Sequence, residues 1–262
     1  MNMGVTTIIV IILIGLFTGI VTGLTGASGN IIVVPLVNML LTFSIHESIG
    51  VSLLVNIIAS FAISYTYYMH GNIDIKLGIW IVIGSISGAL LGAHFADKIS
   101  VVGLSGSFGI FMIVVGIVLW KRGFNRETLE NKKETVKFKT QTQKILTTLI
   151  LGFAVGIMSG IFGSGGGAMI LLILIFVLNI PLRIAIGTSS LLMAITSCSG
   201  ALGYALQGNI RLIPGLIIGL SAAGSGVISA RFANRIDENI LSKAVAIIFM
   251  IFGTVMTIIG LW

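Results

Sequence analysis

Residues 23–30 read Gly-Leu-Thr-Gly-Ala-Ser-Gly-Asn, and residues 160–167 read Gly-Ile-Phe-Gly-Ser-Gly-Gly-Gly. Both stretches interrupt long apolar sequence, and a short apolar run follows each of them. Glycine destabilises a helix interior by about 1 kcal/mol relative to alanine, so clustered glycines end one helix and allow another to begin. We call the two stretches the first and second glycine breaks, and we expect a half-helix to restart near Asn30 and near Ala168.

The composition around these breaks is that of an integral membrane protein. Of 262 residues, 56% are hydrophobic and 9% are charged, whereas soluble domains carry about 25% charged residues. The mean hydropathy is +1.14. These values exclude a cytosolic enzyme and a nucleic-acid binder, and the single cysteine, Cys198, cannot form an internal disulfide. We expect a multi-pass protein of the cell membrane, in contact with lipid and with no nucleic-acid partner.

Long apolar runs predict an all-α polytopic membrane protein. A run of roughly 17–25 residues is long enough to cross the hydrocarbon as a helix, and backbone groups in lipid need the internal partners that a helix provides. Two shorter runs follow the glycine breaks, so the chain has ten membrane segments if these cross and eight if they enter and return. The long runs are at about 5–25, 49–69, 75–95, 101–120, 145–162, 186–206, 212–232 and 241–261, and the short ones at about 31–43 and 168–180.

Basic residues favour the ten-segment arrangement. Residues 121–144 hold eight of the fifteen Lys and Arg, and such clusters beside membrane spans mark the cytoplasmic side. With this linker in the cytoplasm, ten crossings place 13 of the 15 basic residues on its side, and eight crossings place only 10 there. The domain organisation is then a first transmembrane repeat (1–120), a basic cytoplasmic linker (121–144) and a second transmembrane repeat (145–262).

The two halves of the chain are related by an offset of 137 residues. This offset aligns residues 15–99 with 152–236 without a gap, and it superposes the two glycine breaks and a shared Gly-Asn-Ile triplet at 71–73 and 208–210. Five crossings in each half would insert the second repeat upside down. Inverted repeats are typical of alternating-access transporters, whose substrate site lies near the midplane between the halves.

Paired breaks at matching positions are the best sequence indication of such a site. A second shared motif, Gly-Val-Ser-Leu at 50–53 and Gly-Thr-Ser-Ser at 187–190, brings small hydroxyl residues that either cap the following helix or face the breaks. Close helix packing is the alternative interpretation of the glycines, and it fits the regular Gly-x3-Gly seams best. The candidate substrate-binding residues are Gly26, Ser28, Gly29, Asn30, Ser52, Asn56, Gly163, Ser164, Gly165, Gly166, Gly167, Thr188, Ser189 and Ser190.

The chemistry of these candidates favours a small anion. The apolar runs contain no Asp or Glu, so they offer neither the acidic ligands of a cation carrier nor the base of an enzyme. Backbone N–H groups at a helix N-terminus, together with Ser, Thr and Asn, suit an anion. We therefore expect no catalytic activity, no metal and no cofactor. The glycine seams would also permit a homodimer.

At these residues the chain resembles the sulfite exporter TauE/SafE family of membrane transporters. The resemblance rests on residues 163–167 and 187–190, and in the first half on residues 26–30, Pro35, 50–53 and 71–73. The first half departs from the family pattern at Ala27, Ser28, Asn30 and Val51. The resemblance implies secondary transport of sulfur-containing anions such as sulfite or organosulfonates. An anion channel or facilitative pore with the same glycine-rich lining is the alternative.

Overall fold

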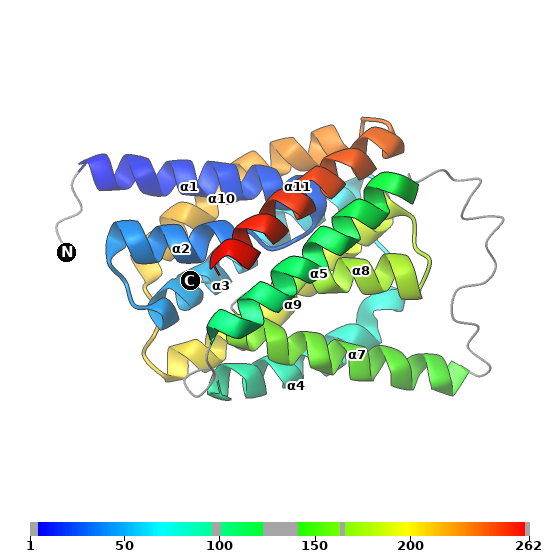
Figure 1. The fold of residues 1–262 in the computed structure, drawn as a ribbon, viewed down its shortest axis with the longest axis horizontal. Helices are drawn as coiled ribbons and strands as arrows, with labels where there is room; N and C mark the ends of the chain where they lie inside the picture. Colours follow the sequence, from blue (N-terminus) through cyan, green and yellow to red (C-terminus); the bar gives the residue numbers. More distant parts are fainter. Residues whose placement is uncertain (1–4, 96–100, 123–140, 163–165, 260–262) are drawn as a thin grey trace.

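The computed structural model describes residues 5–95, 101–122, 141–162 and 166–259, and every regular element in these ranges is a helix (Figure 1). The all-α prediction is confirmed. The first half contains α1 (Val5–Thr25), α2 (Asn30–Leu41), α3 (Ile45–Met69), α4 (Ile75–Phe95) and α5 (Val101–Arg122). The second contains α7 (Gln141–Phe162), α8 (Gly167–Leu172) continued by the π-helix η2 (Ile173–Val177), α9 (Leu182–Leu206), α10 (Leu212–Ala233) and α11 (Glu238–Ile259).

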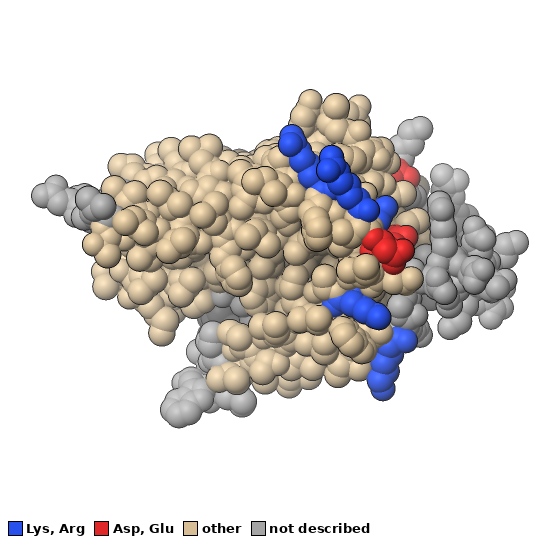
Figure 2. All heavy atoms as spheres, turned by 90° about the horizontal axis from the view of Figure 1, so that it is seen from above, with Lys and Arg blue, Asp and Glu red and all other residues tan. Residues whose placement is uncertain are grey.

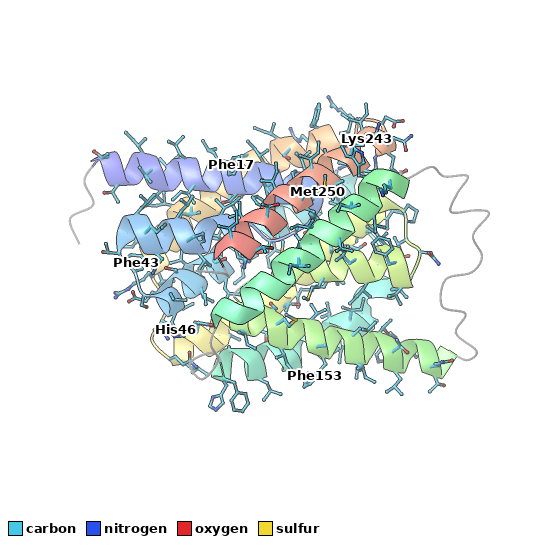
Figure 3. All side chains as sticks on the ribbon, viewed as in Figure 1. Phe17, Phe43, His46, Phe153, Lys243 and Met250 are labelled. Atoms are coloured by element: carbon cyan, nitrogen blue, oxygen red, sulfur yellow. The ribbon has the colours of Figure 1, made fainter. Side chains whose placement is uncertain are left out.

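Six of these helices are long and apolar enough to cross a membrane, namely α1, α3, α4, α9, α10 and α11. The helix α2 and the joined α8 and η2 are shorter. Large apolar side chains such as Phe17, which is 55% exposed, point away from the bundle (Figure 3). An apolar outer surface of this kind is expected where helices face lipid. The multi-pass membrane prediction agrees with these helices.

Four helices, α3, α7, α9 and α11, begin three or four residues earlier than the apolar runs indicated. The helix α3 begins at Ile45 and not at 49, because Ser44 caps it: the Glu47 amide donates to Ser44 Oγ (3.2 Å), and the Ser44 amide donates to Glu47 Oε2 (3.0 Å). This reciprocal pair is a capping box. Its mate α9 begins at Leu182 and not at 186. The capping interpretation of Ser52 is therefore wrong, because this residue lies inside α3.

The helix bounds of the two halves coincide at the offset of 137 residues. Helices α3 and α9 have equal length, as do α5 and α11, and their ends match at this offset; the other bounds differ by at most one residue. The helix pairs α1 with α7, α2 with α8 and η2, and α4 with α10 complete the correspondence. Elements that follow the glycine breaks therefore occupy equivalent positions along the two halves of the sequence.

The glycine seams pack the two halves against each other. A methyl group at Gly19 of α1 would lie 2.1 Å from the carbonyl oxygen of Ala222 on α10. At the equivalent position in the second half, a methyl group at Gly156 of α7 would lie 2.3 Å from the carbonyl oxygen of Ser85 on α4. Only glycine permits backbones to approach this closely. The packing interpretation of these seams is correct.

Contacts along α10 give the directions of its neighbours. Gly15 faces Ile218 and Gly23 faces Gly226, so α1 and α10 run in parallel. Leu54 of α3 lies against Gly215, and Ile63 lies against Gly226, so α3 also runs in parallel with α10. Helices α1 and α3 therefore share one direction, and the short α2 between them returns the chain. The ten-segment arrangement requires this geometry, whereas re-entrant short segments would make α1 and α3 antiparallel.

The two halves run in opposite directions. Gly50, near the start of α3, faces Asn209 beyond the end of α9, and Gly187, near the start of α9, faces Asn72 beyond the end of α3. Helices α3 and α9 are therefore antiparallel. Contacts of α4 with α7 and with α9 show that these three helices run in parallel. Helix α1 is thus antiparallel to its mate α7.

Charged side chains gather at one end of the molecule. On the face that Figure 2 shows, Lys, Arg, Asp and Glu side chains are concentrated at the end where α5 ends and α7 begins, which we call the linker end. The helix directions place Lys121, Arg183, Arg231, Arg235 and Lys243 at this linker end, and Figure 3 labels Lys243 there, with Phe43 and His46 at the opposite end. The linker was predicted at residues 121–144. Helix α5 continues into this range as far as Arg122, and helix α7 begins within it at Gln141.

Candidate functional site

The first glycine break turns the chain through four residues, 26–29, between α1 and α2. Gly26 has φ +63°, a left-handed conformation that glycine adopts without strain. The Thr25 hydroxyl donates to the carbonyl of Val21 (2.8 Å) and accepts from the amide of Ala27 (3.0 Å). The break thus redirects the chain while the Gly26 and Ala27 amides remain hydrogen-bonded.

Helix α2 begins directly after this turn. Gly29 is its N-cap, and the Asn30 amide donates to Ser28 Oγ at 3.2 Å. A methyl group at Gly29 would lie 2.1 Å from Thr18 Cγ2 and 3.4 Å from Thr22 Oγ1, so the start of α2 packs directly on α1. The N-terminal N–H groups of α2 therefore lie inside the bundle, where a helix N-terminus favours negative charge.

The second break has the equivalent place between α7 and α8. Gly166 has φ +73° and is the N-cap of α8, without a side-chain cap hydrogen bond. A methyl group at Gly166 would lie 2.6 Å from Val155 Cγ1 on α7. The candidates Gly163, Ser164 and Gly165 lie outside the described residues. Both half-helices restart where the glycine pattern indicated, at Asn30 and Gly167.

The two breaks meet in the centre of the bundle. A methyl group at Gly167 would lie 2.7 Å from the carbonyl oxygen of Gly26 and 3.2 Å from the amide nitrogen of Ser28. Ser189 of α9 also reaches the first break, because its hydroxyl lies 3.3 Å from the Gly26 carbonyl oxygen and 3.0 Å from that of Ile186. Residues from opposite halves of the chain therefore form one buried cluster.

A pair of buried side chains attaches the first break to α3. Asn56 Nδ2 donates to Ser28 Oγ at 2.8 Å, and Ser28 Oγ lies 3.1 Å from Asn56 Oδ1. Asn56 is 2% exposed and Ser28 is 5% exposed, so water does not compete for these bonds. Ser52, one turn before Asn56 on α3, is fully buried. Buried polar groups that are paired in this way fix the position of the break.

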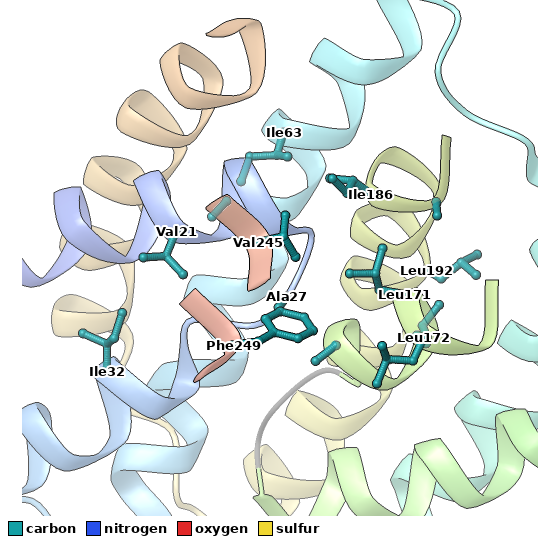
Figure 4. Close-up of a cluster of buried hydrophobic side chains, with 14 of the residues drawn as sticks. Val21, Ala27, Ile32, Ile63, Leu171, Leu172, Ile186, Leu192, Val245 and Phe249 are labelled. Carbon is teal, nitrogen blue, oxygen red and sulfur yellow. The ribbon is translucent and has the colours of Figure 1, made fainter. Parts of the chain in front are cut away.

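Apolar side chains close the cluster from the side of α11. Figure 4 shows Ala27 of the first break near Phe249, with Leu171 of α8 nearby. All three belong to the same buried apolar cluster, and Phe249 is fully buried. This environment lowers the local dielectric constant, which strengthens any interaction between the polar groups of the breaks and a bound charge.

Two predicted residues have other contacts. The Thr188 hydroxyl accepts from the Asp74 amide at 3.0 Å, in the connection between α3 and α4. The Ser190 hydroxyl donates to the carbonyl of Ile186 at 2.8 Å, within its own helix. The hydroxyls of Thr188 and Ser190 are thus hydrogen-bonded to backbone groups away from the breaks. The candidates that the structure does bring together are Gly26, Ser28, Gly29, Asn30, Asn56, Gly167 and Ser189.

Tyr67 contacts the end of α1 beside the first break, and this residue was not identified from the sequence. Its hydroxyl donates to the carbonyl of Gly23 at 3.0 Å and so satisfies a backbone acceptor in the last turn of α1. The hydroxyl of Tyr204, the equivalent residue in the second half, donates to the carbonyl of Ile161 at 3.4 Å in the last turn of α7. The available signal was that tyrosine recurs at the offset of 137. Among the described residues, no group of three His, Cys, Asp or Glu side chains could hold a metal ion.

Comparison with known proteins places this geometry in a family. The chain is 24% identical over 260 residues to the probable membrane transporter protein YunE of Bacillus subtilis, covering 94% of this chain and 95% of that protein. It is 27% identical over 240 residues to the probable membrane transporter protein YdhB of the same organism, covering 90% and 94%. A probable membrane transporter protein of Methanocaldococcus jannaschii is 26% identical over 203 residues, with 74% and 71% covered. No solved structure matches the chain.

The family model described as Sulfite exporter TauE/SafE matches residues 11–256, which is nearly the whole chain. The resemblance seen at the glycine breaks is therefore confirmed. The relatives and the six long apolar helices agree on a multi-pass membrane protein with a transport function. The chain belongs to the sulfite exporter TauE/SafE family of membrane transporters.

Proposed function

We propose that this protein is a secondary transporter that moves a small anion, of the sulfite or organosulfonate type, by alternating access. The observation that carries the proposal is the meeting of the two glycine breaks, where Gly167 of one half touches Gly26 of the other. Elements of oppositely directed halves that meet at mid-bundle are the geometry from which alternating access is built.

The groups around the meeting point support an anion as substrate. The described polar neighbours of the breaks are backbone amides and carbonyls, hydroxyls and the Asn56 carboxamide, and none of them carries a charge. Amide and hydroxyl hydrogens donate to anion oxygens, and the N-terminus of α2 adds partial positive charge. A neutral site also releases its ligand readily, because no ion pair has to be broken.

Bonds between the halves at both ends of the bundle support alternating access over an open pore. At the linker end, Asn72 Nδ2 donates to Asn234 Oδ1 at 2.6 Å. At the opposite end, Arg211 forms a salt bridge with Glu47 at 2.5 Å. Access from either side requires the bonds at that end to separate. We propose that these two closures open in turn, with the linker on the cytoplasmic side.

The test is solute uptake by purified protein in proteoliposomes. Sulfite, thiosulfate, taurine and sulfoacetate are each offered with and without a pH gradient. Saturable uptake of at least one of these anions, with counterflow against an unlabelled internal pool, supports the carrier. Ohmic single-channel current would replace the carrier with a channel, and no movement of any anion would reject the proposed function. Reporter fusions at Asn2 and Trp262 test the orientation.

A further inference from the structure

Hydroxyl groups on the helices of this protein are mostly paired within their own helix. A serine or threonine in an apolar helix usually donates to a carbonyl three or four residues earlier, because no water is present to accept its hydrogen. The described residues that follow this rule include Thr25, Ser64, Thr66, Ser190, Thr196, Ser221, Thr254 and Thr257.

Among the residues that the structure describes, five buried hydroxyls depart from this rule and have no hydrogen-bond partner. They are at most 1% exposed, so solvent does not satisfy them either. An unpaired buried hydroxyl destabilises the folded protein. Each of these groups therefore requires an explanation beyond stability. The five are Thr18, Thr22, Ser60, Ser159 and Ser197.

The unpaired hydroxyls follow the internal offset of the chain. Thr22 and Ser159 are separated by 137 residues, and so are Ser60 and Ser197. Thr18 is the exception, because its equivalent is Val155. Four of the five therefore occupy two equivalent positions in the two halves. Random packing defects would have no reason to recur at one offset.

These positions adjoin the glycine breaks. Thr22 Oγ1 lies 3.4 Å from a methyl group placed at Gly29, and Ser159 Cβ lies 3.7 Å from one placed at the equivalent Gly166. The hydroxyls of α1 and α7 are thus next to the N-caps of α2 and α8. Each of them could donate to a ligand held at the adjacent break.

Ser60 and Ser197 lie on the faces of α3 and α9 that contact the breaks. Ser60 follows Asn56, the partner of Ser28, by one helical turn. Ser197 follows Met193 by one turn, and Met193 Sδ lies 2.4 Å from a methyl group placed at Gly167. Because α3 runs toward the linker end and α9 runs away from it, the two serines lie on opposite sides of the breaks.

We propose that these four hydroxyls line two equivalent anion subsites, which the substrate visits in turn. Thr22 and Ser60 would serve the linker side of the breaks, and Ser159 and Ser197 the opposite side. The inference rests on the proposed function, because it assigns the path by which the anion reaches the central cluster. The hydroxyls stay unpaired when the path is empty and donate to the anion when it passes.

Cysteine labelling tests this assignment without knowledge of the transported solute. Cys198 is the only native cysteine, so Cys198→Ala gives a background in which Thr22→Cys, Ser60→Cys, Ser159→Cys and Ser197→Cys are introduced singly. The probes are an anionic sulfonatoethyl and a cationic trimethylammonium methanethiosulfonate. The controls are Ala59→Cys and Thr196→Cys, which are chain neighbours of the two serines, equally buried and separated from each other by the same offset.

We expect the four cysteines to react roughly tenfold faster than the two controls, and faster with the anionic probe than with the cationic one. In vesicles of known orientation, with the linker side identified by proteolysis within residues 123–140, Ser60→Cys should react from the linker side and Ser197→Cys from the other. Rates equal to the controls, or a preference for the cationic probe, would overturn the subsites. Labelling as expected in a protein that moves no anion would reject the transport proposal alone.

Alanine variants add a readout that a purely structural role would not move. Removal of an unpaired buried hydroxyl should leave the melting temperature unchanged or raise it. Ser60→Ala and Ser197→Ala should nevertheless lower anion uptake, by roughly tenfold if each hydroxyl forms one hydrogen bond to the charged substrate. Uptake equal to that of the unmodified protein would show that the hydroxyls take no part in transport.

Discussion

The two glycine breaks have equivalent backbones and different side chains around them. Beside the first break stand Thr18 and Asn56, and the equivalent positions beside the second are Val155 and Met193. The first break is attached to α3 by hydrogen bonds between Ser28 and Asn56. At the second, the described contacts of Gly166 and Gly167 include the Val155 methyl and the Met193 sulfur.

This difference in side chains predicts that the two breaks differ in mobility. Hydrogen bonds have a preferred geometry, whereas methionine adapts to irregular gaps and tolerates displacement. We therefore expect the first break to stay fixed while the second shifts during transport.

The largest effect is expected where the halves are equivalent. Gly19→Leu and Gly156→Leu each place a side chain against a backbone carbonyl at the seam between the halves, at 2.1 and 2.3 Å for the first carbon. Overpacking of this kind destabilises a core by about 1–3 kcal/mol or more. Both variants should lose the monodisperse peak in size-exclusion chromatography.

Gly224→Leu is the matched control for the seams, because Gly224 lies on α10 with open space around it. It should behave as the unmodified protein. If one seam variant were stable and the other not, the halves would not be structurally equivalent.

A strong effect on transport is expected from alanine at the first break. Gly26→Ala combines strain at φ +63° with a methyl group 2.6 Å from Ser189 Oγ and 2.8 Å from the Ile186 carbonyl oxygen. Left-handed backbone destabilises a non-glycine residue by about 1–2 kcal/mol. Uptake in proteoliposomes should fall below detection, and Gly166→Ala should be milder because the Val155 methyl can move away.

Gly71→Ala separates strain from contact, since Gly71 has φ +71° with no atom near its side-chain position. It should retain uptake while lowering the melting temperature slightly. Equal loss of uptake in Gly71→Ala and Gly26→Ala would mean that strain, and not the site, explains the defect.

A smaller effect should distinguish the first break, which has a polar partner on α3, from the second break, which has an apolar neighbour on α9. Asn56→Leu leaves the Ser28 hydroxyl without this buried partner, which should destabilise the protein by about 1–3 kcal/mol and raise the KM for the anion. Met193→Leu preserves volume and should change stability by less than about 1.5 kcal/mol. Thermal unfolding and uptake kinetics measure both, and a larger effect in Met193→Leu would reverse our assignment of the two breaks.

The smallest effect concerns a contact that only one half has. Glu47 and Arg211 form a salt bridge at the end opposite the linker, whereas their equivalents are Ile184 and Asp74. Because the arginine is exposed, Glu47→Gln should lower the free energy of unfolding by less than about 1 kcal/mol. High salt screens the two charges and should lower the stability of the unmodified protein by a similarly small amount. The measurement is the rate of solute release toward that end. If Glu47→Gln released solute at the same rate as the unmodified protein, the salt bridge would not control this closure.

Much of the fold could be predicted from local sequence. Apolar length located the helices, and the glycine runs predicted restarts near Asn30 and Ala168, within one residue of those observed. The starts of α3 and α9 were missed, because His46, Glu47 and Arg183 interrupt the apolar pattern; a capping box at Ser44 begins α3, whereas α9 begins after Pro181 without a side-chain cap. Apolarity measures solvation and not hydrogen bonding, so helix ends that depend on caps escape it.

The candidate site could be predicted only in part. The residues that the structure brings together, Gly26, Ser28, Gly29, Asn30, Asn56, Gly167 and Ser189, were candidates because they recur or cluster at the breaks. The different use of Thr188 and of its neighbour Ser189 could not be predicted, because adjacent residues on a helix point about 100° apart. Which of them faces the site depends on the rotation of α9 about its own axis.

The sequence by itself determined that this chain lies in a membrane, that its halves correspond at one offset and that each half contains a broken segment. These properties follow from hydropathy and from residue identity at single positions. Only the tertiary structure decided that the two breaks touch, that the halves run in opposite directions and that four equivalent hydroxyls remain unpaired. These features depend on contacts between distant helices, which close packing determines and no local pattern encodes.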